Sequence, residues 1–477
     1  MPHSDIFWAC CLGKEKKGRI MTTVKNKSNT IDMVNGPILK KMILFSVPLM
    51  LSSVLQLLFN AADTVVVGQF AGSNSLAAVG STSSLINLMT NLFIGLSVGT
   101  NVLIAKAMGA RDSEHTRKIV STSMVLALLG GIFLMIFGIF FAGKILALMD
   151  SPAEVLPLAS KYLKIYFIGL PAMMIYNFGS AILRAVGDTK RPLYFLTAAG
   201  VINVIFNLIF VIVFKMDVQG VATATVISQV ISASLIVICL IREKSDIRLN
   251  LKKLGIDKDT LIRILKVGIP AGLQGTLFSL SNVVIQSSVN TFGATVVAGN
   301  SASQNLEGFV YVSMNAVHQA TISFTSQNMG AGRYDRIGKI LKTGVLFVFV
   351  TGLVLGNLEV LFGHQLLRIY SPKAEVIDKG FDRLLIICTI YFLCGIMDVL
   401  VGSIRGMGFS VLPMIVSLIG ACGLRILWLK TFFKMSIFHN TAMIYITYPV
   451  SWTITILGLL VVYRYVRKKI RIMQEAE

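Results

Sequence analysis

Long apolar segments are the feature that most constrains the fold of this chain. The stretch from Ile38 to Phe70, ILKKMILFSVPLMLSSVLQLLFNAADTVVVGQF, is long enough as a helix to cross a bilayer, which takes about 20 mostly apolar residues. Similar runs recur along all 477 residues, and only 14% of the residues are charged. Soluble proteins carry about 25% charged residues. We therefore predict an all-α polytopic membrane protein, since a β-barrel would show alternating segments of about ten residues.

Three polar residues interrupt this first segment at helical spacing. Gln56, Asn60 and Asp63 are four and three residues apart, which places their side chains on one helical face. A carboxylate at membrane depth costs roughly 2.5–3.5 kcal/mol on insertion scales, so a simple anchor would carry Leu there instead. We predict a polar stripe that faces a water-filled cavity, with Asp63 as its ionisable group. The alternative is an acid near the end of the span that reaches the interface or pairs with a neighbour.

The distribution of basic residues predicts the topology. Lys and Arg concentrate in the loops after spans two, four, six and eight, whereas the loops 71–75 and 293–297 are uncharged. By the positive-inside rule, both termini are cytoplasmic. This pattern also accounts for the net charge of +21, so we expect no nucleic-acid partner. The twelve spans are predicted near residues 39–70, 76–106, 117–143, 157–184, 191–215, 219–242, 260–292, 296–329, 337–365, 376–404, 410–434 and 440–465.

An internal repeat divides the chain into two halves. FSVPLMLSSVLQLLFNAADTVVVGQFAG matches VGIPAGLQGTLFSLSNVVIQSSVNTFGA at an offset of 222, which pairs Asn60 with Asn282. MGAR from Met108 matches MGAG from Met329, and LRAVGDTKRP matches IRGMGFSVLP, both at an offset of 221. The repeat predicts two pseudo-symmetric six-helix bundles related by an axis along the membrane normal, an arrangement suited to alternating access.

The repeat also predicts the domain boundaries. We expect a cytoplasmic tail over 1–37, a six-helix lobe over 38–242, a cytoplasmic linker over 243–259, a second six-helix lobe over 260–466 and a cytoplasmic tail over 467–477. The first 35 residues contain no apolar region of signal-peptide type, and Met21 could serve as a second start, so residues 1–20 are expected to be dispensable. No P-loop and no His/Cys metal cluster is found in the sequence. We therefore predict neither an enzyme nor an ATP-driven pump, and no cofactor beyond a coupling ion.

Polar residues in other spans of the first half are candidates for the same site as Asp63. Asn203 and Asn207 lie four residues apart in the fifth span, and Thr225 lies in the sixth. Together with Asp63 and Asn60 they could form one cluster of oxygen ligands for cation or proton coupling. The alternative is that the amides and hydroxyls only join helices, at about 0.6 kcal/mol per contact.

The second half carries its own acids. Glu307 lies in a polar stripe of the eighth span, and Asp398 lies in the tenth span. Either acid could line a cavity or be paired, with Arg405 and Arg425 as candidate partners. The predicted substrate cavity draws on both halves and consists of Gln56, Asn282, Gln304, Glu307, Tyr311 and Asp398.

A carboxyl group in such a cavity suits transport rather than catalysis. Burial disfavours the charged form of a carboxyl, so the group can exchange protons at ordinary pH, or keep its charge by binding Na⁺ or an organic cation. It cannot do both at once, and this competition is the physical basis of antiport. Each pH unit supplies about 1.4 kcal/mol per proton.

The repeated signatures resemble a known family. PLMLSSVLQLLFNAADTVVVGQF, AKAMGARD, LRAVGDTKRPLY, GVATATVISQ, GIPAGLQG and QNMGAGR are similar to the multidrug and toxic compound extrusion (MATE) transporters of bacteria, over about residues 36–466. The resemblance implies a twelve-helix, two-lobed, V-shaped antiporter of the bacterial inner membrane. Such a protein exports small organic cations against H⁺ or Na⁺, and we expect it to be a monomer.

The resemblance also implies site residues. Asp63, Asn203 and Thr225 match the cation site of the family's first lobe, and they would hold Na⁺ in a sodium-coupled member. The chain departs from the family pattern in two places. Asn207 stands where some archaeal members have a second acid, and an apolar or hydroxyl residue near Phe278–Ser279 stands where a sodium-coupled branch has Glu. The coupling ion, H⁺ or Na⁺, therefore stays open.

Two other functions compete with this one. A flippase for a lipid-linked oligosaccharide, of the same superfamily architecture, would need several Arg and Lys in its cavity to bind pyrophosphate. By sequence, the span interiors hold acids and amides with Arg425 as the main exception, which disfavours a flippase. A membrane scaffold without transport has no reason to keep buried acids.

Overall fold

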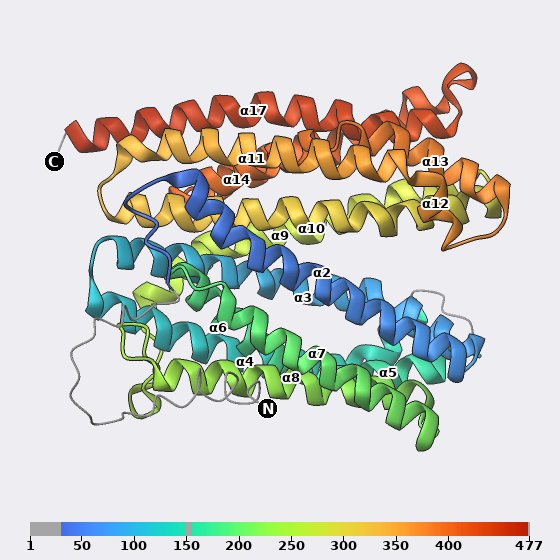
Figure 1. Ribbon diagram of the computed structural model, residues 1–477, viewed down its shortest axis with the longest axis horizontal. Helices are drawn as coiled ribbons and strands as arrows, with labels where there is room; N and C mark the ends of the chain where they lie inside the picture. Colours follow the sequence, from blue (N-terminus) through green and yellow to red (C-terminus); the bar gives the residue numbers. More distant parts are fainter. Residues whose placement is uncertain (1–29, 149–153, 476–477) are drawn as a thin grey trace, which may run out of the picture.

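The structure is a computed structural model that describes residues 30–148 and 154–475. Long α-helices run side by side in two groups, one from each half of the chain (Figure 1). The predicted dispensable segment 1–20 and most of the predicted tail 1–37 lie outside the described residues. The last helix continues through most of the predicted tail 467–477.

The helices follow the predicted spans closely. The first half contains α2 (Ile38–Phe70), α3 (Ser73–Gly109), α4 (Ser113–Leu148), α5 (Leu156–Ile168), α6 (Leu170–Ala185), α7 (Lys190–Leu208), the π-helix η1 (Ile209–Val213) and α8 (Asp217–Arg242), followed by the short turn η2 (Leu251–Lys253). The second half contains α9 (Lys258–Asn290), α10 (Ala294–Gly330), α11 (Tyr334–Leu361), α12 (Gly363–Arg368), α13 (Ala374–Cys388), α14 (Phe392–Gly406), α15 (Val411–Ser417), the π-helix η3 (Leu418–Gly423), α16 (Leu424–Lys430), the turns η4 (Phe432–Lys434) and η5 (Ser436–Phe438), and α17 (Thr441–Glu475).

The span count follows from length, composition and shape. Within the described residues, nine helices are long and apolar enough to cross a membrane, and two bent pairs each add a span, α5 with α6 at 48° and α13 with α14 at 46°. These bends lie in the fourth and tenth spans, which correspond to each other in the repeat. The two halves therefore share the bent shape of this span as well as its sequence pattern. The helix α10 corresponds to the remaining predicted span, the eighth in chain order. It is 37 residues long and tolerates many polar residues because it contacts α2, α3, α11, α13 and α14.

Glycine-rich faces join the two halves near the middle of the molecule. Gly95 and Gly99 of α3 cross Gly268 and Gly272 of α9, at four-residue spacing on both helices. A Cβ on Gly99 would lie 2.5 Å from the carbonyl oxygen of Ile264, and such close backbone approach is what this spacing permits between membrane helices. The α3–α9 crossing is therefore a tight contact between the lobes.

The two copies of the repeated MGA motif meet at one end of the molecule, which we call the closed end. Gly109 ends α3 and Gly330 ends α10. A Cβ on Gly330 would overlap the carbonyl oxygen of Lys106, and a Cβ on Gly109 would overlap that of Gln327. Gln327 also donates a hydrogen bond to the carbonyl oxygen of Ala185 at 2.9 Å. Because each copy of the motif packs on the other copy, the contact follows the predicted pseudo-symmetry.

The residues before α2 are inserted between the halves at the closed end. Met33 has no exposed surface, and its carbonyl oxygen accepts a hydrogen bond from Asn328 of α10 at 3.0 Å. The amide of Ile31 donates to the carbonyl oxygen of Gly187, between α6 and α7, at 3.2 Å. This segment therefore contacts both lobes, which the polar composition of the predicted tail did not indicate.

The linker between the halves is attached to the first lobe. Asp257 caps α9 by accepting from the amide of Thr260 at 2.9 Å, and its own amide donates to Thr122 of α4 at 3.1 Å. The hydrogen bonds from Thr260 hold the pKa of the Asp257 carboxyl below its usual value. The start of the second lobe is thereby fixed against the first.

Candidate functional site

Asp63 lies two turns before the end of α2 and is half-buried. Its carboxylate accepts a hydrogen bond from Nδ2 of Asn207 in α7. The same Asn207 nitrogen donates to Oδ1 of Asn203 at 3.2 Å, and Nδ2 of Asn203 lies 3.4 Å from Oγ1 of Thr225 in α8. The structure therefore brings four of the five predicted coupling residues together in one chain of hydrogen bonds.

Helix packing explains why these residues meet. Asn203 and Asn207 are one turn apart, so they share a face of α7, and α7 packs on both α2 and α8. Directly after Asn207 and Leu208 the chain changes to the π-helix η1, a distortion that is frequent at functional sites. Asn60, the fifth predicted residue, lies one turn before Asp63 but is exposed. No hydrogen bond joins its side chain to the cluster in the described part of the chain.

One acceptor in the cluster has no donor. Oδ1 of Asn207 is buried and accepts no hydrogen bond from the residues that the structure describes. An unsatisfied buried acceptor costs about 1–3 kcal/mol. Beside the Asp63 carboxylate, this oxygen therefore favours a bound cation, or a proton on Asp63. Carboxylate, amide and hydroxyl oxygens are the ligands that hard cations prefer.

The cluster differs from a typical transition-metal site. In residues 30–148 and 154–475 no group of three or more His, Cys, Asp or Glu side chains could hold a metal ion. A cation at Asp63 would instead be held by a single carboxylate and neutral oxygens. A site of this kind with one negative charge matches a proton or a monovalent cation.

The second half holds a buried ion pair that the sequence did not predict. Nε and Nη2 of Arg383 in α13 donate to the two carboxylate oxygens of Glu307 at 2.7 and 2.8 Å. The side chains of Arg383 and Glu307 are only 3% and 7% exposed. Nη1 of Arg383 also donates to Oδ1 of Asn300 at 3.0 Å. Arg383, and neither Arg405 nor Arg425, is thus the partner of Glu307.

The basic residues of the second half correct an expectation from the sequence. Arg425 was predicted to be the main basic exception within the spans, but Arg383, Arg405 and Arg425 are all buried. The signal for Arg383 was present, because it lies in the run FDRLLIICTI inside the predicted tenth span. An arginine at that depth predicts a buried partner.

Asp398 of α14 is buried without a close ion pair. Its carbonyl oxygen lies 2.5 Å from Nδ1 of His318 in α10. Arg405, one of its two candidate partners, donates instead to Oε1 of Gln274 at 2.6 Å. No ion pair within 4.0 Å involves the Asp398 carboxylate in the described residues. Asp398 is therefore an acid whose charge is only remotely compensated.

The other predicted cavity residues lie on helix surfaces. Gln56 of α2, Asn282 of α9, and Gln304 and Tyr311 of α10 are exposed. The predicted cavity set thus divides into exposed polar residues and the two buried acids Glu307 and Asp398. Contact of this set with a substrate stays a prediction.

Removing Arg383 should destabilise the protein strongly. The variant Arg383→Met leaves Glu307 buried without a partner, which we expect to cost about 3–5 kcal/mol. The double variant Arg383→Met/Glu307→Leu replaces the ion pair by apolar groups and should recover most of that loss. Thermal unfolding of the purified proteins in detergent measures both effects. A double variant no more stable than the single variant would contradict this account of the pair.

Comparisons with known proteins give matches over most of the chain. The MatE family model matches residues 48–209 and 270–428, one match in each half. The probable multidrug resistance protein YoeA of Bacillus subtilis (strain 168) is 28% identical over 441 residues, which cover 90% of this chain and 94% of that protein. The probable multidrug resistance protein YpnP of the same organism is 30% identical over 394 residues, 83% of this chain and 88% of that protein.

A solved structure supports the architecture. The outward-facing conformation of a multidrug resistance MATE family transporter of the MOP superfamily superposes with a TM-score of 0.85 and 22% sequence identity. The match covers 94% of this chain and 100% of that chain. At this identity the likeness concerns the fold, and it confirms the predicted fold of twelve helices in two lobes.

Proposed function

We propose that this chain, which belongs to the MatE family, exports small organic cations in exchange for H⁺ or Na⁺ by alternating access. The observation that carries the proposal is Asp63, a half-buried carboxyl that accepts a hydrogen bond from Asn207. The acceptor oxygen of Asn207 has no donor among the residues that the structure describes. The relatives described above are named as multidrug resistance proteins, which supports drug efflux here. The protein works in the bacterial inner membrane and acts as a monomer.

Asp63 is the coupling group in this mechanism. When the site faces the outside, H⁺ or Na⁺ from the medium neutralises the carboxylate, and the organic cation loses its counter-charge and leaves. When the site faces the cytoplasm, the ion leaves and the ionised carboxylate attracts the next organic cation. Asn207, Asn203 and Thr225 hold the carboxylate in place and offer oxygens to the bound ion.

The closed end is the cytoplasmic end in this proposal. Lys106 and Arg111 flank the end of α3, and Arg333 and Arg336 follow the end of α10. Basic loops of this kind stay on the cytoplasmic side, which also places both termini there. The lobes meet at this end, and with the closed end on the cytoplasmic side we assign the structure to an outward-facing state of the proposed cycle.

A flippase for a lipid-linked oligosaccharide is the second candidate. The sequence disfavours a flippase because few basic residues are expected inside the spans, but the structure shows three buried arginines in the described part of the second half. However, Glu307 neutralises Arg383, and Arg405 is bonded to Gln274. A pyrophosphate needs several basic groups that act together, whereas these arginines are accompanied by the buried acids Glu307 and Asp398, so drug efflux remains the preferred function.

Transport in proteoliposomes tests the proposal. Purified protein should move the fluorescent cation ethidium when a pH gradient or a Na⁺ gradient is imposed, and one of the two gradients should suffice. Exchange of one H⁺ for one monovalent cation moves no net charge, so a membrane potential alone should drive little transport. Protein-free liposomes are the control. Absence of ethidium movement under both gradients would refute ion-coupled efflux.

A further inference from the structure

Arg425 of α16 is a buried cation without a carboxylate partner. It is 7% exposed, and its Nε donates to Oγ of Ser451 in α17 at 2.9 Å. Among residues 30–148 and 154–475, no ion pair within 4.0 Å includes Arg425. A buried charge without a counter-charge is costly, whereas Arg383 nearby is neutralised by Glu307.

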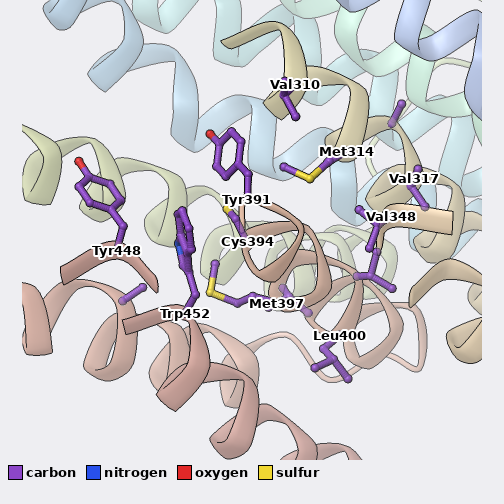
Figure 2. Close-up of a cluster of buried hydrophobic side chains, with 14 of the residues drawn as sticks. Val310, Met314, Val317, Val348, Tyr391, Cys394, Met397, Leu400, Tyr448 and Trp452 are labelled. Carbon is purple, nitrogen blue, oxygen red and sulfur yellow. The ribbon is translucent and has the colours of Figure 1, made fainter. Parts of the chain in front are cut away.

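The Arg425 guanidinium lies over two aromatic rings. Its Cζ lies 4.2 Å from the ring centroid of Tyr448 and 5.9 Å from that of Trp452. Figure 2 shows Tyr448 and Trp452 in one cluster with Tyr391 and Cys394. An aromatic ring stabilises a cation through its π-system, without occupying the N–H donors of the guanidinium as a hydrogen-bond acceptor would. Ser451 uses one of the five donors, so the others are available to a ligand.

The buried charges of the second half favour an anion at this position. Among the second-half residues that the structure describes, three buried guanidiniums, those of Arg383, Arg405 and Arg425, are accompanied by two buried carboxylates, those of Glu307 and Asp398. One positive charge is therefore in excess even when both acids are ionised. Arg425 carries that excess, because it has neither a carboxylate nor a side-chain amide as a partner in the described residues.

The position of Arg425 connects it to the predicted cavity. Cys422, one turn earlier, lies 3.8 Å from the carbonyl oxygen of Leu277 in α9. Five residues after Leu277, the same helix carries the exposed Asn282. The helix α16, which carries Arg425, thus packs on the helix that carries Asn282 of the predicted cavity.

We infer that Arg425, together with Ser451 and Tyr448, forms a subsite for a carboxylate of the transported compound. This inference rests on the proposed efflux function and specifies its substrates, which then include zwitterions that carry both a cationic group and a carboxylate. The planar guanidinium binds a carboxylate through two parallel hydrogen bonds, a geometry that a lysine cannot provide.

Two matched dyes test the subsite. Rhodamine B carries a free carboxylate, and its ethyl ester is the same cationic ring system without that charge. In proteoliposomes of neutral phosphatidylcholine, the wild-type protein should export both dyes. Arg425→Gln should raise the KM for rhodamine B about tenfold, as expected for the loss of a charge-assisted hydrogen bond, while the KM for the ester is retained. Arg425→Lys keeps the positive charge but lacks the two parallel N–H donors of the guanidinium, so it should give an intermediate KM for rhodamine B.

The outcomes separate the two proposals. Failure of the wild-type protein to export the ester would overturn the efflux function and the subsite together. Export of the ester but not of rhodamine B, or equal changes for both dyes in Arg425→Gln, would overturn the subsite alone. If the Arg425 variants do not fold, the subsite can still be tested by measuring competition for rhodamine B binding to the wild-type protein. Benzoate should displace bound rhodamine B and benzamide should not, and equal displacement by both would also overturn the subsite.

Discussion

Replacing Asp63 by Asn should abolish coupled efflux while the protein still folds and reaches the membrane. Asn has the shape of Asp and can keep a hydrogen bond with Asn207, so the packing of α2 on α7 is retained. It cannot ionise, so it neither attracts an organic cation nor exchanges one for H⁺ or Na⁺. Ethidium accumulation in inverted vesicles measures the effect, and detection of the protein in the membrane fraction verifies its expression.

The expected size of this effect follows from the energetics of exchange. One proton per monovalent cation sustains about a tenfold concentration ratio for each pH unit, because each pH unit supplies about 1.4 kcal/mol. In Asp63→Asn this ratio should fall to one. The matched control is Thr64→Val, which changes an exposed residue next to Asp63 without altering its shape and should keep efflux. Full efflux by Asp63→Asn would exclude Asp63 as the coupling group.

The sequence predicted the helices well because their determinants are local. Length and hydropathy identify α2 over Ile38–Phe70, and the repeat identifies its counterpart in α9. The helix α10 was also predicted, although its composition is too polar for a lipid-facing span. It is stable because other helices surround it, which depends on contacts between segments far apart in the sequence.

The candidate site was predictable within one helix but not between helices. Spacing shows that Asn203 and Asn207 share a face, but the pairing of Asp63 with Asn207 joins residues 144 positions apart. The sequence grouped Asn207 with Asp63 only as one alternative, and the family resemblance covered Asp63, Asn203 and Thr225 but not Asn207. The resemblance did not cover Arg383 either, whose burial comes from the packing of α13 against α10 and α17. A basic residue near the start of a span is easily assigned to the interface from sequence alone.

The two lobes share an architecture but differ in charge. The register partner of Asp63 is Ile285, which is buried in the hydrophobic core of the second lobe. The second lobe instead has three buried arginines, of which Arg425 has no ion-pair partner within the described residues. Duplication thus preserved the helices and their glycine contacts, while the buried ionisable groups diverged. A cationic group near Asp63 and an anionic group near Arg425 would each find the opposite charge.

Replacing Gly330 by Ala should prevent the closed end from forming and so block transport. A Cβ at this position would overlap the backbone carbonyl oxygen of Lys106, which cannot move aside as a flexible side chain could. Overpacking costs about 1–3 kcal/mol. If this cost falls only on the state in which the closed end is formed, the equilibrium shifts about 5- to 150-fold toward the state in which the lobes are separated at that end. We expect the lobes to separate at this end and ethidium efflux to fall accordingly.

Chemical labelling tests the separation directly. Ser323 of α10 is 1% exposed and donates to Oδ1 of Asn101 in α3 at 3.1 Å. A cysteine at position 323 should therefore be inaccessible to a maleimide in the protein that keeps Gly330. In the Gly330→Ala background, Ser323→Cys should react with a membrane-impermeant maleimide added to inverted vesicles. Gly338→Ala is the control, since in the described part of the chain a Cβ placed there meets no heavy atom within 4 Å beyond its own stretch of helix. Unchanged labelling together with normal efflux in Gly330→Ala would show that this glycine contact is not needed for closure. Faster labelling with lost efflux would show that transport requires the two MGA motifs to meet.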